Sequence, residues 1–243
     1  MSAGPIADVH ARRGERERHG SAARGMFERI APTYDVLNAL LSAGTDRRWR
    51  RSAIEELTDV GPGPVLDLCA GTMDLAAAIA KARPLENVVA VDFSPAMLAR
   101  GRHKAPAAQV VVADASSLPF DAHCFAAVLC GFGMRNLADA KAGASEVLRV
   151  LRPGGIFVTL EFFRPERAAA RAFHRAYATG VLPALGGLVS GDRGAYQYLA
   201  QSMKGFLSRR EYETMLSGVG FRGIAGRDMT LGVASIVRAQ AGI

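Results

Sequence analysis

The chain has 243 residues, 49% of them hydrophobic and 22% charged, and its formal net charge at pH 7 is +7. These values describe a globular protein with a large core and exclude a wholly disordered chain or a small disulfide scaffold. We expect no membrane-spanning helix and no secretory signal, because no apolar run reaches roughly 18 residues and the N-terminus is polar. The three cysteines lack metal-ligand spacing, so we expect no metal site and a reducing cytoplasm.

Residues 1–25 are polar and charged, which predicts a disordered basic tail. Five arginines fall within residues 12–24, and this charge is either simply solvated or attracts the tail to an anionic membrane or a nucleic acid. Hydrophobic residues at helical spacing predict helices over Met26–Leu57, with Asp46 as the N-cap of the last one. We expect residues 26–243 to form a single domain.

Beyond this segment, short apolar runs alternate with helical patterns, which indicates a parallel sheet covered by helices on both faces. The expected strands are Val65–Leu68, Val88–Asp92, Gln109–Ala113, Ala126–Cys130, Ile156–Glu161, Phe221–Arg227 and Leu231–Arg238. The expected helices are Leu75–Lys81, Pro95–Arg102, Ala138–Leu151 and Arg209–Ser217, with a helical insertion at about 165–202. The last two strands are close enough in sequence to form an antiparallel hairpin.

The first strand leads into a loop of small residues and then a helix, at the edge of the sheet where ligands bind in such folds. The strand carries Asp67, and the loop carries Gly71, which lets the backbone approach a ligand, and Thr72 near the helix start. Only one of the three glycines of a dinucleotide loop is present, and Met73 replaces the third, so no pyrophosphate is expected. Helix capping by Thr72 and Asp74 explains the loop almost as well.

Acidic residues also follow the second and third strands. Asp92 can accept hydrogen bonds from both ribose hydroxyls, each worth roughly 1.5–3 kcal/mol, or it can cap the next helix, although Ser94 can fill that role itself. Asp114 can pair with an adenine edge through its carboxylate and the Ala115 amide; alternatively it is a solvated loop residue. With Asp67, these side chains fit the adenosine recognition of a class I methyltransferase.

The segment Gly131–Asn136 follows the fourth strand, and its two glycines allow a sharp turn beside a ligand. An arginine at the position of Arg135 can hold the phenolate or enolate oxygen of a substrate. The alternative is a surface ion pair, with Asn136 capping the next helix. Together the strand ends predict an α/β class I S-adenosylmethionine-dependent methyltransferase, with a Rossmann-like, mostly parallel seven-stranded sheet that ends in the antiparallel hairpin.

Further motifs are Met26-Phe27…Tyr34-Asp35…Asn38, Leu118-Pro119-Phe120, Gly131 to Asp139, Arg149 to Gly155, Leu160-Glu161-Phe162 and Tyr196-Gln197-Tyr198-Leu199-Ala200. Through them the chain resembles the ubiquinone/menaquinone biosynthesis C-methyltransferase family from Met26 to about Arg238. The resemblance departs at Met73, a family glycine, and at Gly131, where many members have serine. The family's cofactor contacts, carried over by position, fall on Thr72, Asp92, Asp114, Ala115 and Gly131. With Asp67 and Gly71 from the first strand and its loop, the expected cofactor-binding set is Asp67, Gly71, Thr72, Asp92, Asp114, Ala115 and Gly131.

The resemblance implies that S-adenosylmethionine methylates a ring carbon of demethylmenaquinol, a prenylated quinol. We expect Arg135 to stabilise the phenolate of the quinol while Asn136 and Tyr34 orient its ring; these three are the expected catalytic residues. The alternatives are methylation of another phenol, such as a benzoquinol of the ubiquinone pathway or a polyketide, and a non-catalytic role in a quinone-synthesis complex. These alternatives stay open at the level of the sequence.

The expected location is the cytoplasm, with peripheral contact at the inner face of the membrane, where a prenylated substrate lies. No appended RNA-binding module or aromatic-rich basic stripe is visible, so we expect no nucleic-acid partner. The sequence leaves open whether the protein forms a homodimer.

Overall fold

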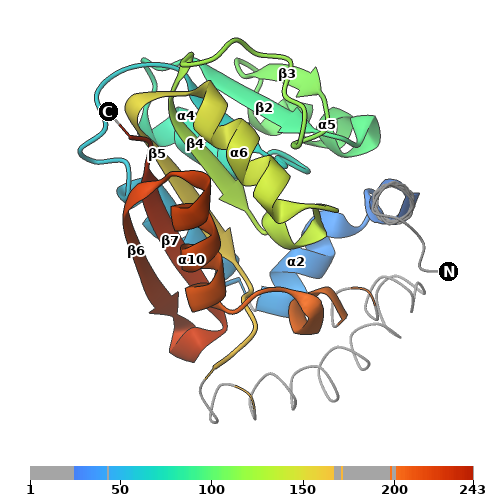
Figure 1. Cartoon of the computed structure of the whole chain (residues 1–243). Coiled ribbons are helices and arrows are strands. Elements are labelled where there is room, and N and C mark those ends of the chain that lie inside the picture. Colours follow the sequence, from blue (N-terminus) through green and yellow to red (C-terminus); the bar gives the residue numbers. More distant parts are fainter. Residues whose placement is uncertain (1–24, 43, 167–170, 172–197, 199–200, 243) are drawn as a thin grey trace, which may run out of the picture.

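The computed structural model describes residues 25–42, 44–166, 171, 198 and 201–242. Within them, seven strands form one sheet in the order β3-β2-β1-β4-β5-β7-β6 (Figure 1). Strands β1 to β5 pair in parallel, whereas β7 runs antiparallel to both β5 and β6. The strands are β1 Val65–Leu68, β2 Val88–Asp92, β3 Gln109–Val112, β4 Phe125–Gly131, β5 Leu151–Glu161, β6 Arg222–Met229 and β7 Ala234–Gln240.

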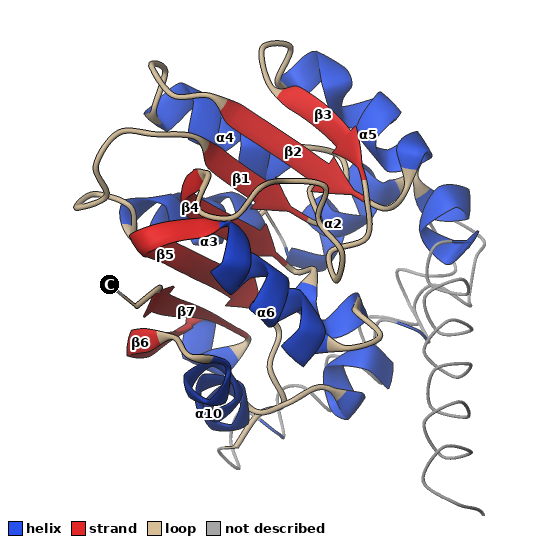
Figure 2. Ribbon diagram, turned by 45° about the horizontal axis from the view of Figure 1, so that its top comes forward, coloured by secondary structure: helices blue, strands red, loops and turns tan. Residues whose placement is uncertain are grey.

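Helices cover both faces of the sheet (Figure 2). Helices α6 and α10 pack against each other on one face, and α3 and α4 pack against each other on the opposite face. The main helices are α2 Tyr34–Ser42, α3 Asp46–Glu55, α4 Asp74–Ala82, α5 Pro95–Gly101, α6 Ala140–Val150 and α10 Arg209–Val219. The strand order reverses at β1, which lies between β2 and β4, and this reversal opens the crevice where ligands bind in open α/β sheets.

The strand side chains divide between two hydrophobic clusters, one on each face of the sheet. In β1, Leu66 and Leu68 join the cluster that includes α6 and α10, whereas Val65 joins the cluster that includes α3 and α4. Every residue of β1 and of β2 is buried, which is why both strands are continuous apolar runs. The carboxylates of Asp67 and Asp92 are therefore exceptions that need a specific reason to be buried.

The predicted fold class is confirmed, and apart from the insertion at about 165–202 each predicted strand and helix from Val65 onward is found, with ends that differ by at most five residues. The prediction that Asp46 caps α3 is wrong: the N-cap is Thr45, and Asp46 is the first helical residue. The predicted start of the last strand at Leu231 is also wrong. Leu231 is 93% exposed in a left-handed turn with φ 58°, and β7 begins three residues later.

Two predicted segments fall largely outside the described residues: the tail over 1–25, except Gly25, and most of the insertion at about 165–202. Among the helices that the structure describes, none is both long enough and apolar enough to cross a membrane.

Candidate active site

The loop between β1 and α4, residues 69–73, is built on left-handed backbone. Cys69, Gly71 and Met73 have φ angles of 57°, 52° and 61°. Glycine adopts such angles without strain, which is a physical reason for the family glycine at position 73. At a non-glycine residue this conformation costs roughly 1–2 kcal/mol. The side chain of Met73 is fully buried in the cluster with α3 and α4, and this burial offsets the strain.

Asp67 holds the start of α4 from the neighbouring strand. Its Oδ2 accepts the backbone N–H of Ala76, the third residue of the helix, at 2.8 Å. No capping hydrogen bond from Thr72 or Asp74 is found at this helix start, so the capping interpretation of the loop is wrong. Asp67 is 1% exposed, and burial raises the pKa of Asp67 to about 8.

Asp92, the last residue of β2, fixes the tip of the 69–73 loop. Its Oδ2 accepts the N–H of Gly71 and its Oδ1 accepts the N–H of Ser94, both at 2.9 Å. Ser94 caps α5 by accepting the N–H of Met97, as the sequence suggested it could. Each oxygen of Asp92 keeps a lone pair for a further donor. Burial raises the pKa of Asp92 above its ordinary value.

The hydroxyl of Thr72 forms a hydrogen bond with another residue of the protein. Its Oγ1 donates to Oδ1 of Asp35 in α2 at 2.5 Å, and the residue is buried. Any contact of Thr72 with a ligand is therefore expected through its backbone. The bond joins the loop to a helix that lies 37 residues earlier in the chain.

Asp114 and Ala115 follow β3 at the same edge of the sheet. Oδ1 of Asp114 accepts the amide and the hydroxyl of Ser116 at 2.7 and 2.6 Å, which fixes the carboxylate in a turn. Its Oδ2 has no partner within the described part of the chain, and the side chain is exposed. Ala115 is buried. The carboxylate thus has one oxygen oriented by the turn and one available to a ligand.

Two glycines bring the segment after β4 close to the 69–73 loop. A Cβ on Gly133 would lie 2.4 Å from the Cβ of Cys69, so only glycine fits there. A Cβ on Gly131 would lie 3.3 Å from Cδ2 of Leu75, a tight contact that Leu75 would have to relieve. This close approach packs the backbone at Gly133 against Cys69 of the loop.

Arg135 and Glu161 form a buried ion pair. Nη1 of Arg135 donates to Oε1 of Glu161 at 2.6 Å and to the carbonyl of Phe132 at 2.7 Å. The side chains are 7% and 0% exposed, so the interpretation of Arg135 as part of a surface ion pair is wrong. Burial raises the pKa of Glu161, and the positive charge of Arg135 opposes that rise. The Nε of Arg135 is buried and has no partner within the described residues, which leaves a donor for a ligand.

Asn136 and Tyr34 lie beside Arg135. Nδ2 of Asn136 donates to the Phe132 carbonyl at 3.1 Å, and its Oδ1 accepts the hydroxyl of Tyr198 at 3.2 Å. Helix α6 is capped by Asp139, so the alternative role of Asn136 as a helix cap is wrong.

Charged groups of the site influence the Tyr34 hydroxyl. Burial raises the pKa of Tyr34, while a hydrogen bond with Asn38 and the charge of Arg135 oppose the rise, and Asp92 adds to it. The ring of Tyr34 lies close to the 69–73 loop, with Cε1 3.9 Å from the position of a Cβ on Gly71.

Aromatic rings form a wall next to these polar groups. Phe27 packs edge-on against Tyr34, Phe93 and Tyr198, with ring centroids 6.1 to 6.4 Å apart. Phe93 directly follows Asp92 in the chain. Such a wall suits a flat apolar ligand next to a polar group.

Sequence reasoning gave no role to three residues that the structure places at the site: Glu161, Asp35 and Tyr198. Glu161 ends β5 as Asp92 ends β2, so a charged residue at the end of an apolar strand was a usable signal. Asp35 and Tyr198 contact the site across long sequence separations, for which a single sequence carries no signal.

The charge of the site suits a cationic cofactor. Asp67 and Asp92 are buried near the same loop, and neither forms a salt bridge with a described residue. A Cβ on Gly71 would lie 3.4 Å from Met97 Cε and 3.9 Å from Tyr34 Cε1, so its backbone lies close to these two side chains. S-adenosylmethionine carries a sulfonium and an ammonium group and no phosphate, and it fits these groups. Within the described residues, no cluster of metal-ligating side chains occurs.

The fold and this site define a class I S-adenosylmethionine-dependent methyltransferase. The model of the ubiE/COQ5 methyltransferase family matches residues 15–240, and the chain belongs to that family. It is 45% identical over 215 residues to a demethylmenaquinone methyltransferase of Thermus thermophilus, covering 87% of this chain and 97% of that protein. It is 42% identical over 231 residues to the ubiquinone/menaquinone biosynthesis C-methyltransferase UbiE of Geobacter sulfurreducens, covering 92% and 90%.

Solved structures share the fold at much lower identity. A SAM-dependent methyltransferase of Thermotoga maritima is 16% identical, with a TM-score of 0.65 over 90% of this chain and 99% of that one. The cyclase SpnF is also 16% identical, with a TM-score of 0.67 over 90% of this chain and 96% of its own. Because a cyclase shares the architecture, the fold alone does not define the reaction.

Replacement of Met73 by glycine tests whether burial of the Met73 side chain outweighs the strain of its left-handed backbone. The change relieves roughly 1–2 kcal/mol of backbone strain but removes a buried side chain worth roughly 2–5 kcal/mol. We expect Met73→Gly to lower the free energy of unfolding in urea by about 1–3 kcal/mol. Cys69→Gly, which relieves the same strain with a smaller loss of side chain, is the matched control and should change stability less. A Met73→Gly variant more stable than the parent would contradict this balance.

The raised pKa of Asp67 predicts how stability depends on pH. The folded protein keeps a proton on Asp67 that the unfolded chain releases near pH 3.9, so the free energy of unfolding should fall as pH rises from about 4 to about 8. In Asp67→Asn the amide oxygen still accepts the Ala76 N–H without titrating, and the dependence should flatten. Urea unfolding across this range measures the slope, with Asp114→Asn as an exposed control. Equal slopes in Asp67→Asn and the parent would show that Asp67 does not cause the pH dependence of stability.

Proposed function

We propose that the protein transfers a methyl group from S-adenosylmethionine to a ring carbon of demethylmenaquinol, the final methylation of menaquinone synthesis. Membership of the ubiE/COQ5 family supports this, as does the relative named for demethylmenaquinone methylation. The observation that carries the proposal is the unpartnered, buried Nε of Arg135, whose neighbour Asn136 accepts the hydroxyl of Tyr198 from the aromatic wall. Relatives are also named for ubiquinone synthesis, so a benzoquinol is the second candidate substrate.

The strand ends supply the proposed cofactor contacts. Asp92 receives the ribose hydroxyls on its remaining lone pairs, and Asp114 receives the adenine amino group on its free Oδ2, next to the amide of Ala115. The backbones of the 69–73 loop and of the β4 end line the methionine part. Asp67 acts from behind the loop, through its hold on α4. These roles cover the predicted set: Asp67, Gly71, Thr72, Asp92, Asp114, Ala115 and Gly131.

Arg135 supplies the proposed electrostatic contribution to the reaction. The bound cofactor presents a methyl group on a sulfonium, which is already a good leaving group. In the protein, Arg135 holds the quinol oxygen as a phenolate, whose proton passes to water, and thereby increases the electron density at the ring carbon. The hydrogen of that ring carbon leaves as a proton to water after the transfer, which restores the aromatic ring. Glu161 fixes the orientation of the guanidinium through two hydrogen bonds. Its Oε1 accepts Nη1 of Arg135, and its Oε2 accepts the backbone N–H of Arg135 at 3.2 Å. Asn136 and Tyr34 hold the ring in line with the methyl group, so that orientation lowers the barrier.

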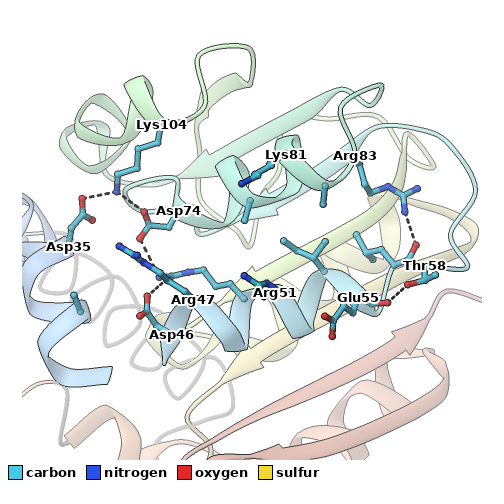
Figure 3. Close-up of a pocket in the computed structure, with 16 residues that line it drawn as sticks. Asp35, Asp46, Arg47, Arg51, Glu55, Thr58, Asp74, Lys81, Arg83 and Lys104 are labelled. Carbon is cyan, nitrogen blue, oxygen red and sulfur yellow. Dashed lines mark hydrogen bonds and ion pairs between the residues drawn. The ribbon is translucent and has the colours of Figure 1, made fainter. Parts of the chain in front are cut away.

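We further propose that the protein contacts the cytoplasmic surface of the membrane, where its prenylated substrate resides. A groove of about 850 Å³ between α3 and α4 supports this proposal. Arg47, Arg51 and Lys81 line it, are exposed and form no salt bridge with a described residue (Figure 3). Unpaired cations of this kind attract anionic lipid head groups, at about 1 kcal/mol per residue near the surface. The absence of a nucleic-acid partner stays a prediction, and self-association into a homodimer stays open.

The substrate is tested by complementing a strain blocked at the last methylation of menaquinone synthesis and analysing its quinones by mass spectrometry. We expect menaquinone to reappear. We expect Arg135→Lys, which keeps a charge but loses the oriented fork, to lower turnover of the purified enzyme by about 100-fold. Arg149→Lys alters an arginine that binds Glu146 and two carbonyls away from the site, and it serves as the control. A fully active Arg135→Lys variant would rule out the assigned role.

Membrane contact is tested by sedimentation with vesicles of phosphatidylglycerol or of phosphatidylcholine. The double variant Arg51→Glu/Lys81→Glu should bind the anionic vesicles at least about tenfold more weakly than the parent. Lys141→Glu/Arg222→Glu makes the same change in net charge on other elements and should bind within about twofold of the parent. Equal losses in both double variants would show that net charge, and not the groove, attracts the membrane.

A further inference from the structure

Three aspartates lie in the first turns of three successive helices beside the 69–73 loop: Asp35 in α2, Asp46 in α3 and Asp74 in α4. Two cations bridge them (Figure 3). Nζ of Lys104 lies 2.7 Å from a carboxylate oxygen of Asp35 and 2.7 Å from one of Asp74. Arg50 pairs with Asp46 and lies 3.4 Å from Asp74. We call these five side chains the clasp.

The clasp fixes helix α2 at both ends. At the start of the helix, Asp35 is joined through Lys104 to the start of α4. At its end, Ser42 donates its hydroxyl to Oδ1 of Asp46 at 2.8 Å, which joins α2 to α3. Three carboxylates face two cations, and the positive ends of the three helix dipoles compensate for part of the excess negative charge.

Two consecutive residues of helix α2, Tyr34 and Asp35, make different contacts. Asp35 accepts the hydroxyl of Thr72, so it holds the 69–73 loop. Tyr34 lies close to Gly71, with Cε1 3.9 Å from the position of a Cβ there. The charge of Arg135 opposes the rise in the pKa of the Tyr34 hydroxyl that burial causes. A shift of α2 would therefore disturb the loop and the ring of Tyr34 together.

Asp35 is suited to a permanent ionic role. Partial burial opposes ionisation, but the hydrogen bonds from Lys104 and Thr72 outweigh it and lower the pKa of Asp35. Its side chain is 32% exposed and that of Lys104 is 19% exposed, so the pair is sheltered from full screening by salt.

We propose that Asp35 is a positioning residue for methyl transfer: through the clasp and Thr72 it fixes the position of Tyr34 relative to the cofactor loop. The inference rests on the proposed function, because it assigns Tyr34 to the quinol. Asp35 contacts no reacting atom in this account. It acts by aligning the ring carbon with the methyl group, and small losses of alignment reduce kcat strongly.

The test uses Asp35→Asn, which is nearly isosteric, and Lys104→Met, which removes the bridge from the other side. In each, we expect kcat with demethylmenaquinol to fall about tenfold, while the Kd for S-adenosylmethionine rises about threefold and the melting temperature stays within a few degrees. The controls are Glu213→Gln and Arg209→Met. Arg209 bridges Glu213 and Asp228 with similar side-chain exposures, 23 to 33%, so both controls should stay within about twofold of the parent.

A double-mutant cycle separates positioning from general stabilisation. If Asp35 acts through the ring of Tyr34, Asp35→Asn should cost little further kcat in a Tyr34→Ala background, which lacks that ring. Additive losses, or an unchanged kcat and Kd in both clasp variants, would overturn the proposal. A different result would contradict the proposed function: a parent enzyme that binds the cofactor but does not methylate demethylmenaquinol. In that case the rise in cofactor Kd still decides whether the clasp holds the loop.

Discussion

Three aspartates from three different elements hold the loop over residues 69–73, and the rest of the site is arranged around that loop. Asp67 of β1 binds the first turn of α4 behind it, Asp92 of β2 binds the amide at its tip, and Asp35 of α2 binds the hydroxyl of Thr72. Each bond satisfies a backbone or side-chain donor that would otherwise be buried without a partner. The left-handed residues of the loop keep their strained backbone because these contacts and the burial of Met73 determine it.

The distribution of charge gives the site two distinct halves. On the loop side, Asp67 and Asp92 are buried and form no salt bridge with a described residue, and Asp92 is the carboxylate that reaches the tip of the loop. On the other side, Arg135 is neutralised by Glu161 and yet keeps one donor without a partner. Under the proposed function, the loop side receives the methyl donor and the Arg135 side receives the phenolate of the quinol. Tyr34 lies close to Gly71 of the loop, on a helix that Asp35 joins to Thr72.

Much of this arrangement could be predicted from the sequence. The apolar runs gave the strands, and parallel strands necessarily bring Asp67, Asp92 and Asp114 to one edge of the sheet. The missing glycines indicated an unusual loop, but only the φ angles show that Cys69 and Met73 take the glycine conformation. The bonds of Thr72 to Asp35 and of Arg135 to Glu161 could not be predicted, since they join residues 37 and 26 positions apart and depend on how helices dock. Local choices among neighbours, such as Thr45 rather than Asp46 as a cap, are equally hard to predict because both residue types cap helices well.

The central claim is that the loop side and the Arg135 side together perform carbon methylation of a naphthoquinol. The most direct measurement supplies the purified protein with S-adenosylmethionine deuterated in its methyl group and with reduced demethylmenaquinone, and then analyses the quinone product by mass spectrometry. The account predicts menaquinone with the intact deuterated methyl group on a ring carbon. A protein that binds the cofactor but leaves demethylmenaquinol unlabelled, or that places the label on oxygen, would contradict it.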